Sequence, residues 1–148
     1  MQNVDTLADN VFENFILLTS YIGNHLTSIG NQCFKGCSCL INATVPNSLE
    51  RLGASSYYNC NHLTSFAFEN GSKLATISQY TFSGCEKLTS LNLPMSVSKF
   101  EENAFNGSSI LRFDIQNENA LGIRSGSEVA NSCKAKDKAM FYTSRNNF

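Results

Sequence analysis

The feature that most constrains the fold of this chain is a repeat of 22 to 25 residues that recurs five times. The repeats align on one apolar reference column, which holds Leu7, Ile29, Leu52, Ile77 and Phe100 at spacings of 22, 23, 25 and 23 residues. A single segment of this length cannot bury its own apolar side chains, whereas stacked copies bury them against one another. The sequence therefore predicts a repeat solenoid of stacked coils.

Three further columns keep their residue type from repeat to repeat. Three residues before the reference column stand the aliphatic residues Val4, Leu26, Leu49, Leu74 and Val97. Five residues after it stand the aromatic residues Phe12, Phe34, Tyr57, Phe82 and Phe105, and seven after it stand Asn14, Gly36, Asn59, Gly84 and Gly107. We expect a stack of rings in the core. We also expect a turn with a positive φ, which Gly and Asn adopt at low cost.

Later in each repeat, most copies read L-x-x-L-x-L, most clearly at residues 63–68 and 88–93. This pattern ends in the period-two alternation of a strand with one buried face. We expect one parallel sheet of short strands, centred near Ser20, Asn42, Ser65, Ser90 and Arg112. Pro46 and Pro94 follow the second and fourth strands, where a residue without an N–H ends a ladder.

The repeats resemble the BspA-like leucine-rich repeats, a family known from bacterial surface proteins and unicellular parasites, with the approximate pattern I-G-x-x-A-F-x-G-C-x-x-L-T-S-I-x-I-P. Residues 29–37 read I-G-N-Q-C-F-K-G-C, and residues 81–94 read T-F-S-G-C-E-K-L-T-S-L-N-L-P. The resemblance covers roughly residues 4–116. It implies a right-handed β-solenoid or horseshoe of the leucine-rich-repeat type, with the parallel sheet on its inner face. It also implies surface display, adhesion or protein binding, and it brings no catalytic motif.

The repeats divide the chain into two parts, residues 1–117 with five repeats and residues 118–148 as a non-repeat cap or tail. The tail has two interpretations, a helix over 127–141 that begins at Ser127 or a final strand over 139–143. Either would cover the open edge of the last coil. The first repeat departs most from the pattern, because Phe15 replaces a cysteine and Gly23 replaces an apolar strand residue. It is either a cap or the end of a longer array.

The cysteines and histidines do not form a recurring chemical set. Cys37, Cys60 and Cys85 share one column and are predicted to be buried, reduced thiols, with Cys39 near solvent. No second cluster at zinc-like spacing accompanies Cys33, Cys37 and Cys39, so we predict no metal and no cofactor. His25 and His62 occupy different columns and are expected in exposed turns. Without a Ser/His/Asp or Cys/His set, the chain is not expected to be an enzyme.

The third and fifth positions of L-x-x-L-x-L point away from the core and form the predicted binding face. It comprises Ser20, Asn42, Thr44, Ser65, Ala67, Ser90, Asn92, Arg112 and Asp114, with Ile22 completing the fifth-position column. This face is small, polar and nearly neutral. Two alternatives stay open here: that the face binds a protein ligand, and that its Thr-Ser pairs merely suit strands.

We therefore expect a non-catalytic protein-binding or adhesion module with a protein or a host or matrix surface as its partner. The alternative is an intracellular leucine-rich-repeat scaffold. A formal net charge of −1 argues against nucleic-acid binding, and no apolar run is long enough for membrane insertion. The resemblance suggests a cell-surface or secreted protein, although residues 1–9 show no secretory signal. The sequons at Asn42, Asn70 and Asn106 matter only for a chain exported by a eukaryote.

Overall fold

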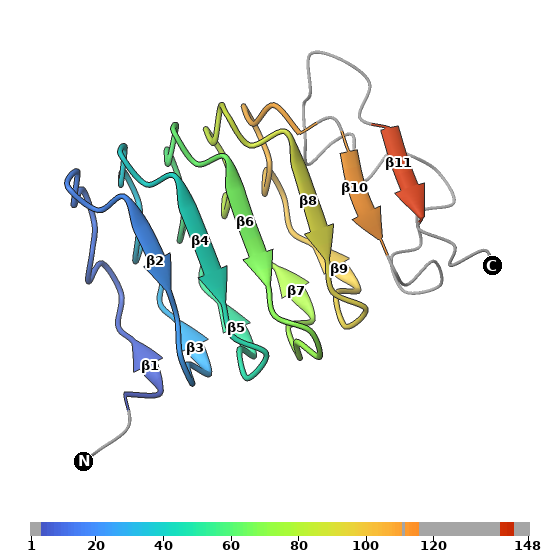
Figure 1. Ribbon diagram of the computed structural model, residues 1–148, viewed down its shortest axis with the longest axis horizontal. Coiled ribbons are helices and arrows are strands. Elements are labelled where there is room, and N and C mark those ends of the chain that lie inside the picture. The colour runs from blue at the N-terminus through green and yellow to red at the C-terminus, as the bar shows by residue number, and fades with distance from the viewer. Residues whose placement is uncertain (1–3, 111, 116–139, 144–148) are drawn as a thin grey trace.

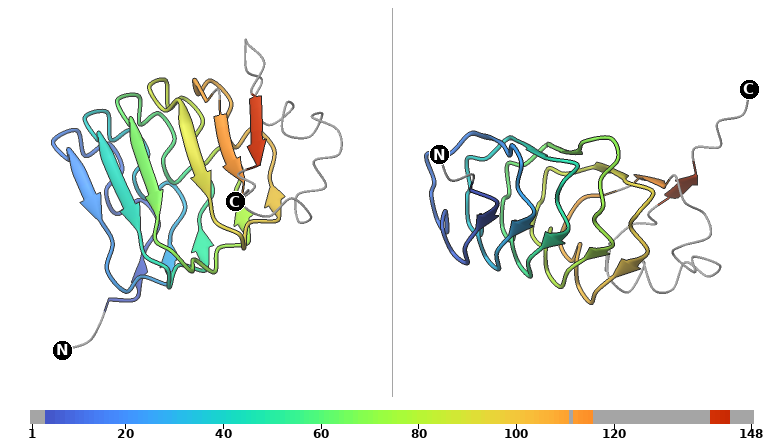
Figure 2. Two further views of the ribbon diagram at one scale, coloured as in Figure 1. Left: turned by 45° about the vertical axis from the view of Figure 1, so that its right-hand side comes forward. Right: turned by 90° about the horizontal axis from the view of Figure 1, so that it is seen from below.

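In a computed structural model the chain winds into a stack of coils, which confirms the predicted repeat solenoid (Figure 1). The structure describes residues 4–110, 112–115 and 140–143, and the last two ranges by their backbone alone. One row of strands consists of β2 (Ser20–Ile22), β4 (Asn42–Val45), β6 (Ser65–Phe68), β8 (Ser90–Leu93), β10 (Arg112–Ile115) and β11 (Met140–Thr143). A row of two-residue strands consists of β1 (Thr6–Leu7), β3 (Ser28–Ile29), β5 (Arg51–Leu52), β7 (Thr76–Ile77) and β9 (Lys99–Phe100). The two rows run along different sides of the stack (Figure 2).

The long strands lie where the L-x-x-L-x-L pattern places them. The strand pairs among the described residues are parallel, and Asn42 stands in register with Ser20 on one side and Ser65 on the other. Ser90 stands in register with Arg112 in the same way. As predicted, Pro46 directly follows the last residue of β4, and Pro94 directly follows the last residue of β8. The row of two-residue strands was not predicted, because two residues are too few to show an alternation.

The prediction of one continuous sheet is wrong, because the hydrogen-bond ladder breaks between β6 and β8. Strands β2, β4 and β6 form one sheet, and β8, β10 and β11 form another. The short row divides at the same coil, into β1–β3–β5 and β7–β9. The break falls at the longest repeat, where 25 residues separate Leu52 from Ile77. A hydrogen-bond ladder needs neighbouring strands in a fixed register. The inserted residues 69–73 disturb this register between β6 and β8.

The arc that carries the aromatic column stays paired through every coil, including the coil with the insert. The backbone N–H of each of the first four ring residues donates to a carbonyl of the following coil: Phe12 to Cys33 at 2.8 Å, Phe34 to Ser56 at 2.8 Å, Tyr57 to Thr81 at 3.0 Å and Phe82 to Ala104 at 2.7 Å. The coils therefore stay stacked without a break at the insert, although both rows of strands are interrupted there.

Two columns of this arc have a positive φ. The predicted Asn/Gly column is confirmed, with φ from 56° at Asn59 to 76° at Gly107. At Gly36 a Cβ would also collide with the side-chain oxygen of Asn14, so both the angle and the space demand glycine. A second column, not predicted, comprises Asn10, Gln32, Ser55, Tyr80 and Asn103 with φ from 56° to 63°. Its residue types vary too much to be recognised in the sequence.

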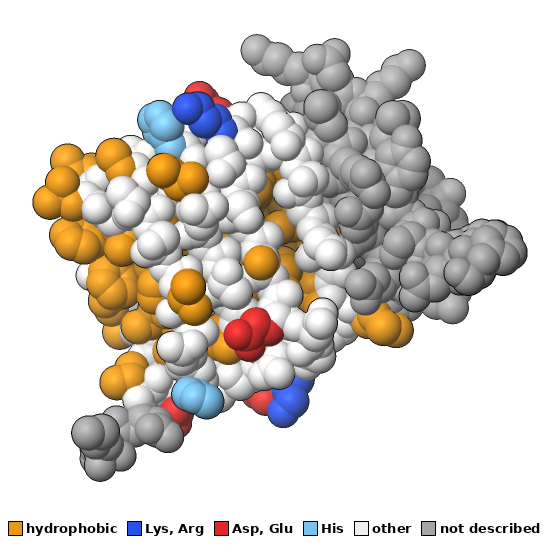
Figure 3. All heavy atoms as spheres, in the orientation of Figure 1, with side chains coloured by type: hydrophobic (Ala, Val, Ile, Leu, Met, Phe, Trp, Pro, Cys, Tyr) orange, Lys and Arg blue, Asp and Glu red, His pale blue; other side chains and the backbone are white. Residues whose placement is uncertain are grey.

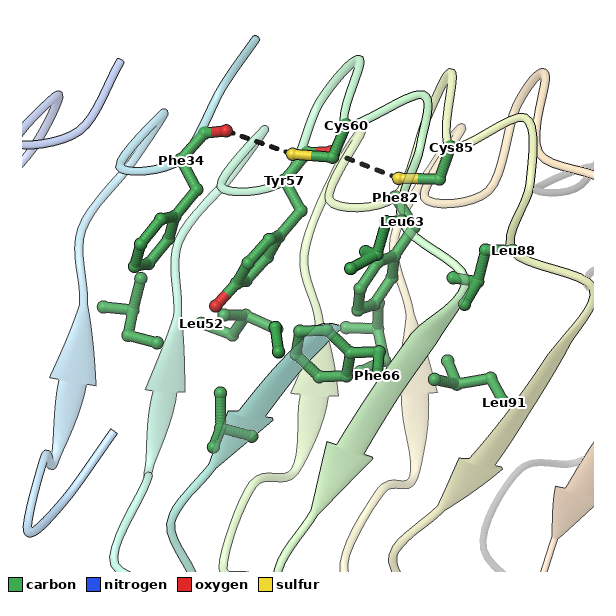
Figure 4. Packing of buried hydrophobic residues seen from close by; sticks show 14 of the residues in the cluster. Phe34, Leu52, Tyr57, Cys60, Leu63, Phe66, Phe82, Cys85, Leu88 and Leu91 are labelled. Atoms are coloured by element: carbon green, nitrogen blue, oxygen red, sulfur yellow. Dashed lines mark hydrogen bonds between the residues drawn. The ribbon is translucent and has the colours of Figure 1, made fainter. Parts of the chain in front are cut away.

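The core is a set of rows that run through the coils. The predicted ring stack is confirmed, with centroid distances from 4.9 to 5.9 Å and interplanar angles from 6° to 15° between successive rings (Figure 4). Leu63, Leu88 and Leu91 pack beside the rings and are buried. In the first coil (residues 4–25), Leu7 and Phe12 are only partly buried, because this coil has a described neighbour on one side only.

In the tail, the final-strand interpretation is confirmed over 140–143. Strand β11 pairs in parallel with β10, and Met140 stands opposite Arg112. The helical interpretation is wrong for residues 140 and 141, because the open edge of β10 offers N–H and C=O groups that a strand can satisfy. Residues 127–139, which it also covered, lie outside the described residues. In the described part of the chain, no helix is long and apolar enough to cross a bilayer.

Candidate binding face

The candidate site is the long-strand face, which we define as the outward side chains of β2, β4, β6, β8 and β10. In β8, Ser90 and Asn92 are exposed while Leu91 and Leu93 are buried, as the alternation predicts. Of the nine predicted residues, Ser20, Asn42, Ser65, Ala67, Ser90 and Asn92 are exposed and Thr44 is partly buried. Arg112 and Asp114 lie in β10 in register with Ser90 and Asn92. Their side chains lie outside the description.

The register arranges these side chains in two rows across the strands. One row runs Ser20, Asn42, Ser65 and the other Ile22, Thr44, Ala67. Adjacent members of a row are about 4.8 Å apart, the spacing of paired strands. Within the described side chains the two rows carry no charge, and non-hydrophobic atoms predominate on this part of the surface (Figure 3). Hydroxyl and amide groups both donate and accept hydrogen bonds, so the hydroxyl and amide members of these rows suit polar contacts.

Both predicted turn histidines are exposed. His25 has a φ of 60° in the turn before β3. His62 precedes β6, and its Nδ1 lies 2.8 Å from the carbonyl oxygen of Ser38 in the preceding coil. The two histidines thus lie in turns of different kinds. In the described residues, no group of three or more His, Cys, Asp and Glu is placed to hold a metal ion.

A small cleft, which the sequence analysis missed, lies beside the insert at the break between the sheets. Its lining comprises Phe68, Asn70, Gly71, Ser72, Asn92, Leu93, Pro94 and Met95, and its volume is about 130 Å³. Sites for small organic ligands usually measure roughly 300–1,000 Å³. The cleft is therefore smaller than a usual site for a small organic ligand. The one sequence signal for it is the longer third repeat.

The cysteine column is buried, as predicted, and has an additional role. The thiols of Cys37, Cys60 and Cys85 donate to the carbonyl oxygens of Phe12, Phe34 and Tyr57 in the preceding coil, at 3.1, 3.1 and 3.2 Å. Figure 4 shows the contacts of Cys60 and Cys85. These contacts join consecutive coils, which the sequence did not reveal. Cys33 is also buried, and Cys39 is exposed as predicted. All five are free thiols, and Cys133 lies outside the described residues.

Burial keeps the four buried thiols, those of Cys33, Cys37, Cys60 and Cys85, protonated at neutral pH. It raises the pKa of Cys33 to about 11 and the pKa of Cys85 to about 12. Burial also raises the pKa of Cys37 and that of Cys60. A thiol with a raised pKa stays protonated, and the thiolate is the nucleophilic form. The column therefore acts as core and as hydrogen-bond donor, not as a reactive centre.

Parallel short strands, stacked rings and a paired turn arc in every coil define a leucine-rich-repeat solenoid. The chain belongs to the BspA type leucine-rich repeat family, whose model matches residues 5–127 as six copies. This match confirms the resemblance and extends beyond residue 117, where the sequence pattern ends the repeats. The family is a repeat scaffold. No protein of curated function matches the chain.

Solved structures of bacterial leucine-rich-repeat proteins share the fold. The leucine-rich repeat protein of T. pallidum matches with a TM-score of 0.70 and 24% identity, over 76% of this chain and 52% of that one. The pneumococcal vaccine antigen PcpA matches with a TM-score of 0.61 and 31% identity, over 66% and 24%. A leucine-rich cell surface protein from Faecalibacterium prausnitzii matches with a TM-score of 0.64 and 20% identity, over 86% and 33%. The chain thus spans about half of the first of these proteins and a third or less of the others.

Proposed function

We propose that this chain is a non-catalytic recognition module that binds a protein ligand through the long-strand face. The observation that carries the proposal is the arrangement of exposed, uncharged, hydrogen-bonding side chains on rigid parallel strands. The strands hold these side chains in place because the alternate residues, such as Leu91, are locked in the core. A preorganised polar surface loses little conformational freedom when a partner binds.

The size of the face argues for weak binding by one module. Five strands with four gaps of about 4.8 Å span roughly 19 Å. A standard stable interface buries roughly 800 Å² on each partner, more than this small patch offers. We therefore infer that useful affinity comes from several modules acting together.

Arg112 and Asp114 in β10 are the charged members of the predicted face. An Arg guanidinium offers five donors in a rigid fork, which suits specific contacts with a partner. We propose that these two residues supply the charged contact and that the uncharged rows supply shape. The alternative is that they adapt the last predicted coil to water.

Display on a cell surface is the setting that we propose. It is supported by the family and by the structural similarity to the F. prausnitzii protein, which is a leucine-rich cell surface protein. The competing setting is an intracellular scaffold, favoured by the five free thiols, since disulfides accumulate in oxidising compartments. Surface labelling of intact producing cells separates the two, because an intracellular chain stays unlabelled until the cells are lysed.

The binding test compares two matched pairs of substitutions. Ser65→Tyr with Ser90→Tyr places two rings on adjacent coils of the long-strand face. Ala75→Tyr with Ser98→Tyr places two rings on adjacent coils beside the short strands, where both residues are also exposed. Binding of bead-displayed protein to immobilised matrix proteins and intact epithelial cells is then measured. We expect the first pair to reduce capture at least about tenfold and the second pair to leave it unchanged.

A third variant, Arg112→Ala with Asp114→Ala, tests the charged contact. We expect reduced capture with an unchanged melting temperature, since both changes remove polar groups from an outward column. Circular dichroism checks that all three variants remain folded. Unchanged capture in both long-strand variants would exclude this face, and the insert at 69–73 would become the next candidate.

A further inference from the structure

Exposed apolar side chains gather on one coil of the solenoid. Six large hydrophobic residues of the first coil are exposed, a group that we call the first-coil patch: Val4 at 65%, Val11 at 49%, Phe15 at 46%, Ile16 at 56%, Leu17 at 79% and Ile22 at 68%. In the rest of the described chain, the large hydrophobic residues exposed in this way are Ile41 and Met95. Figure 3 shows the same concentration of hydrophobic side chains over the end of the stack that carries the first coil.

One half of the first-coil patch is exposed because no described coil precedes it. Val11 occupies a column whose other members, Cys33, Ser56, Thr81 and Ala104, are fully buried. Val4 and Phe15 likewise have buried counterparts in the later coils. In the part of the chain that the structure describes, no backbone hydrogen bond reaches the carbonyls of Val11 or Glu13, although the equivalent carbonyls of Cys33 and Lys35 accept one each. This half is an open stacking surface.

The other half has a different origin. Leu17 occupies an outward column that holds Cys39, His62 and Lys87 in the later coils, and all three stay exposed. Ile22 occupies the column of Thr44, Ala67 and Asn92, which also stays largely outside the core. A preceding coil would therefore not cover Leu17 or Ile22. Whatever buries the whole patch must extend past the end of the coil and around its side.

Two of the three carboxylates of the first coil, those of Asp9 and Glu13, are engaged with the second coil, and the third, that of Asp5, is exposed. An oxygen of the Asp9 carboxylate accepts from the backbone N–H of Asn31 in the second coil, at 2.7 Å. The Glu13 carboxylate lies 3.1 Å from Nζ of Lys35, and the hydrogen bonds from Lys35 and Asn10 lower its pKa. Residues 15–22 read F-I-L-L-T-S-Y-I, without a charge, a proline or a glycine. Strand β2 thus lacks the charged or proline residues that usually protect an edge strand from pairing.

We infer that the first-coil patch docks onto the first-coil patch of a second copy of this chain. The exposed parts of its six side chains amount to on the order of 500 Å² of apolar surface, near the upper end of the largest patch on a typical monomer. A standard interface buries roughly 800 Å² per partner, so the patch would supply more than half of that area. A two-fold arrangement buries the same patch on both copies and closes on itself. The six side chains of the patch are uncharged, so none of them enters the interface as an unpaired charge.

The inference does not rest on the proposed function: the two surfaces share Ile22 alone, and the tyrosine variants at Ser65 and Ser90 leave the first-coil patch unchanged. A dimer would nevertheless present two long-strand faces at once, which would raise the strength of a weak interaction through multivalency.

The test is sedimentation velocity of the full chain across a series of micromolar concentrations. We expect a monomer–dimer equilibrium. Leu17→Asp with Ile22→Asp should weaken association by about 100-fold or more, because unpaired carboxylates would be buried in the interface. Met95→Asp is the matched control, an exposed apolar residue outside the patch, and should leave the equilibrium unchanged. Circular dichroism should show all variants folded, since the altered side chains are exposed.

Three results would overturn the inference. The first is a monomer at every concentration, and the second is a dimer that survives the Leu17 and Ile22 substitutions or is lost equally with Met95→Asp. The third is a monomer that co-sediments with neutral phosphatidylcholine vesicles through Leu17, which would assign the patch to a lipid surface. Capture by the long-strand face is scored separately with the tyrosine variants, so failure of the dimer leaves the proposed function standing.

Discussion

Replacing Tyr57 with phenylalanine should stabilise the protein, which is unusual for a substitution in a buried core. Tyr57 is completely buried, and its hydroxyl has no hydrogen-bond partner among the described residues. Figure 4 shows this hydroxyl pointing toward Leu52, into aliphatic surroundings. The other members of the same column are phenylalanines, and the Tyr57 ring already lies parallel to Phe34 and Phe82, at 9° and 13°.

The expected gain is the difference between two unequal effects. A buried hydroxyl without a partner destabilises the folded state by about 1–3 kcal/mol. Its removal also loses the dispersion contacts of one oxygen atom, each worth only about 0.1–0.2 kcal/mol. The ring stack itself is retained. We expect a net increase of about 1 kcal/mol in the free energy of unfolding, or about 2–4 °C in Tm for a chain of this size.

Urea unfolding followed by circular dichroism measures the change, with Phe82→Tyr as the reciprocal control. Phe82 is also fully buried in the same column, so adding a hydroxyl there should cost about 1–3 kcal/mol. Equal slopes in urea would show that the unfolded state is unaffected. The reasoning is refuted if Tyr57→Phe lowers stability by more than about 0.5 kcal/mol, since the hydroxyl must then have a partner.

Three further predictions concern the core. Leu91→Ala should cost about 2–5 kcal/mol, because Leu91 is buried in β8 between neighbouring coils, and a loss below about 1 kcal/mol in urea unfolding would place it outside the core. Unfolded, unreduced protein treated with iodoacetamide should be alkylated at Cys37, Cys60 and Cys85, and an unmodified pair in the mass spectrum would reveal a disulfide. Above pH 9 the unfolded thiols lose protons that the folded ones keep, so stability should fall up to about pH 11, by as much as ~1.4 kcal/mol per pH unit for each buried thiol. A flat stability curve between pH 9 and 11 would contradict the burial of these thiols.

Much of the fold can be predicted because each coil obeys local rules that the sequence repeats. Gly84 and Asn59 stand where the chain needs a positive φ, and few other residues adopt that conformation cheaply. Leu91 and Ser90 alternate because a strand sends neighbouring side chains to opposite faces. These preferences act within a few residues, so they appear in the sequence as columns.

For the candidate face, the sequence predicts which side chains point outward but not which of them contact a ligand. The alternation places Ser65 and Ala67 outward, and the structure has both exposed. Which of these residues contacts a ligand depends on the shape of the partner, and this sequence contains no information about that shape. The first-coil patch could not be predicted from the repeat columns either, because the columns do not show which of their members are exposed. Leu17 and Ile22 stand out because their counterparts in the later coils are smaller or polar residues, most of which the structure shows to be exposed.

The sequence by itself determined the repeat, the order of the strands, the ring stack and the buried cysteine column. Only the tertiary structure decided how neighbouring coils meet: the ladder that breaks between β6 and β8, the positive φ at Tyr80, and the thiol of Cys60 that donates to the carbonyl of Phe34. The division has a physical reason. Column positions follow from the preferences of single residues, whereas contacts between coils join residues more than 20 positions apart, and their geometry depends on how the whole coil is placed.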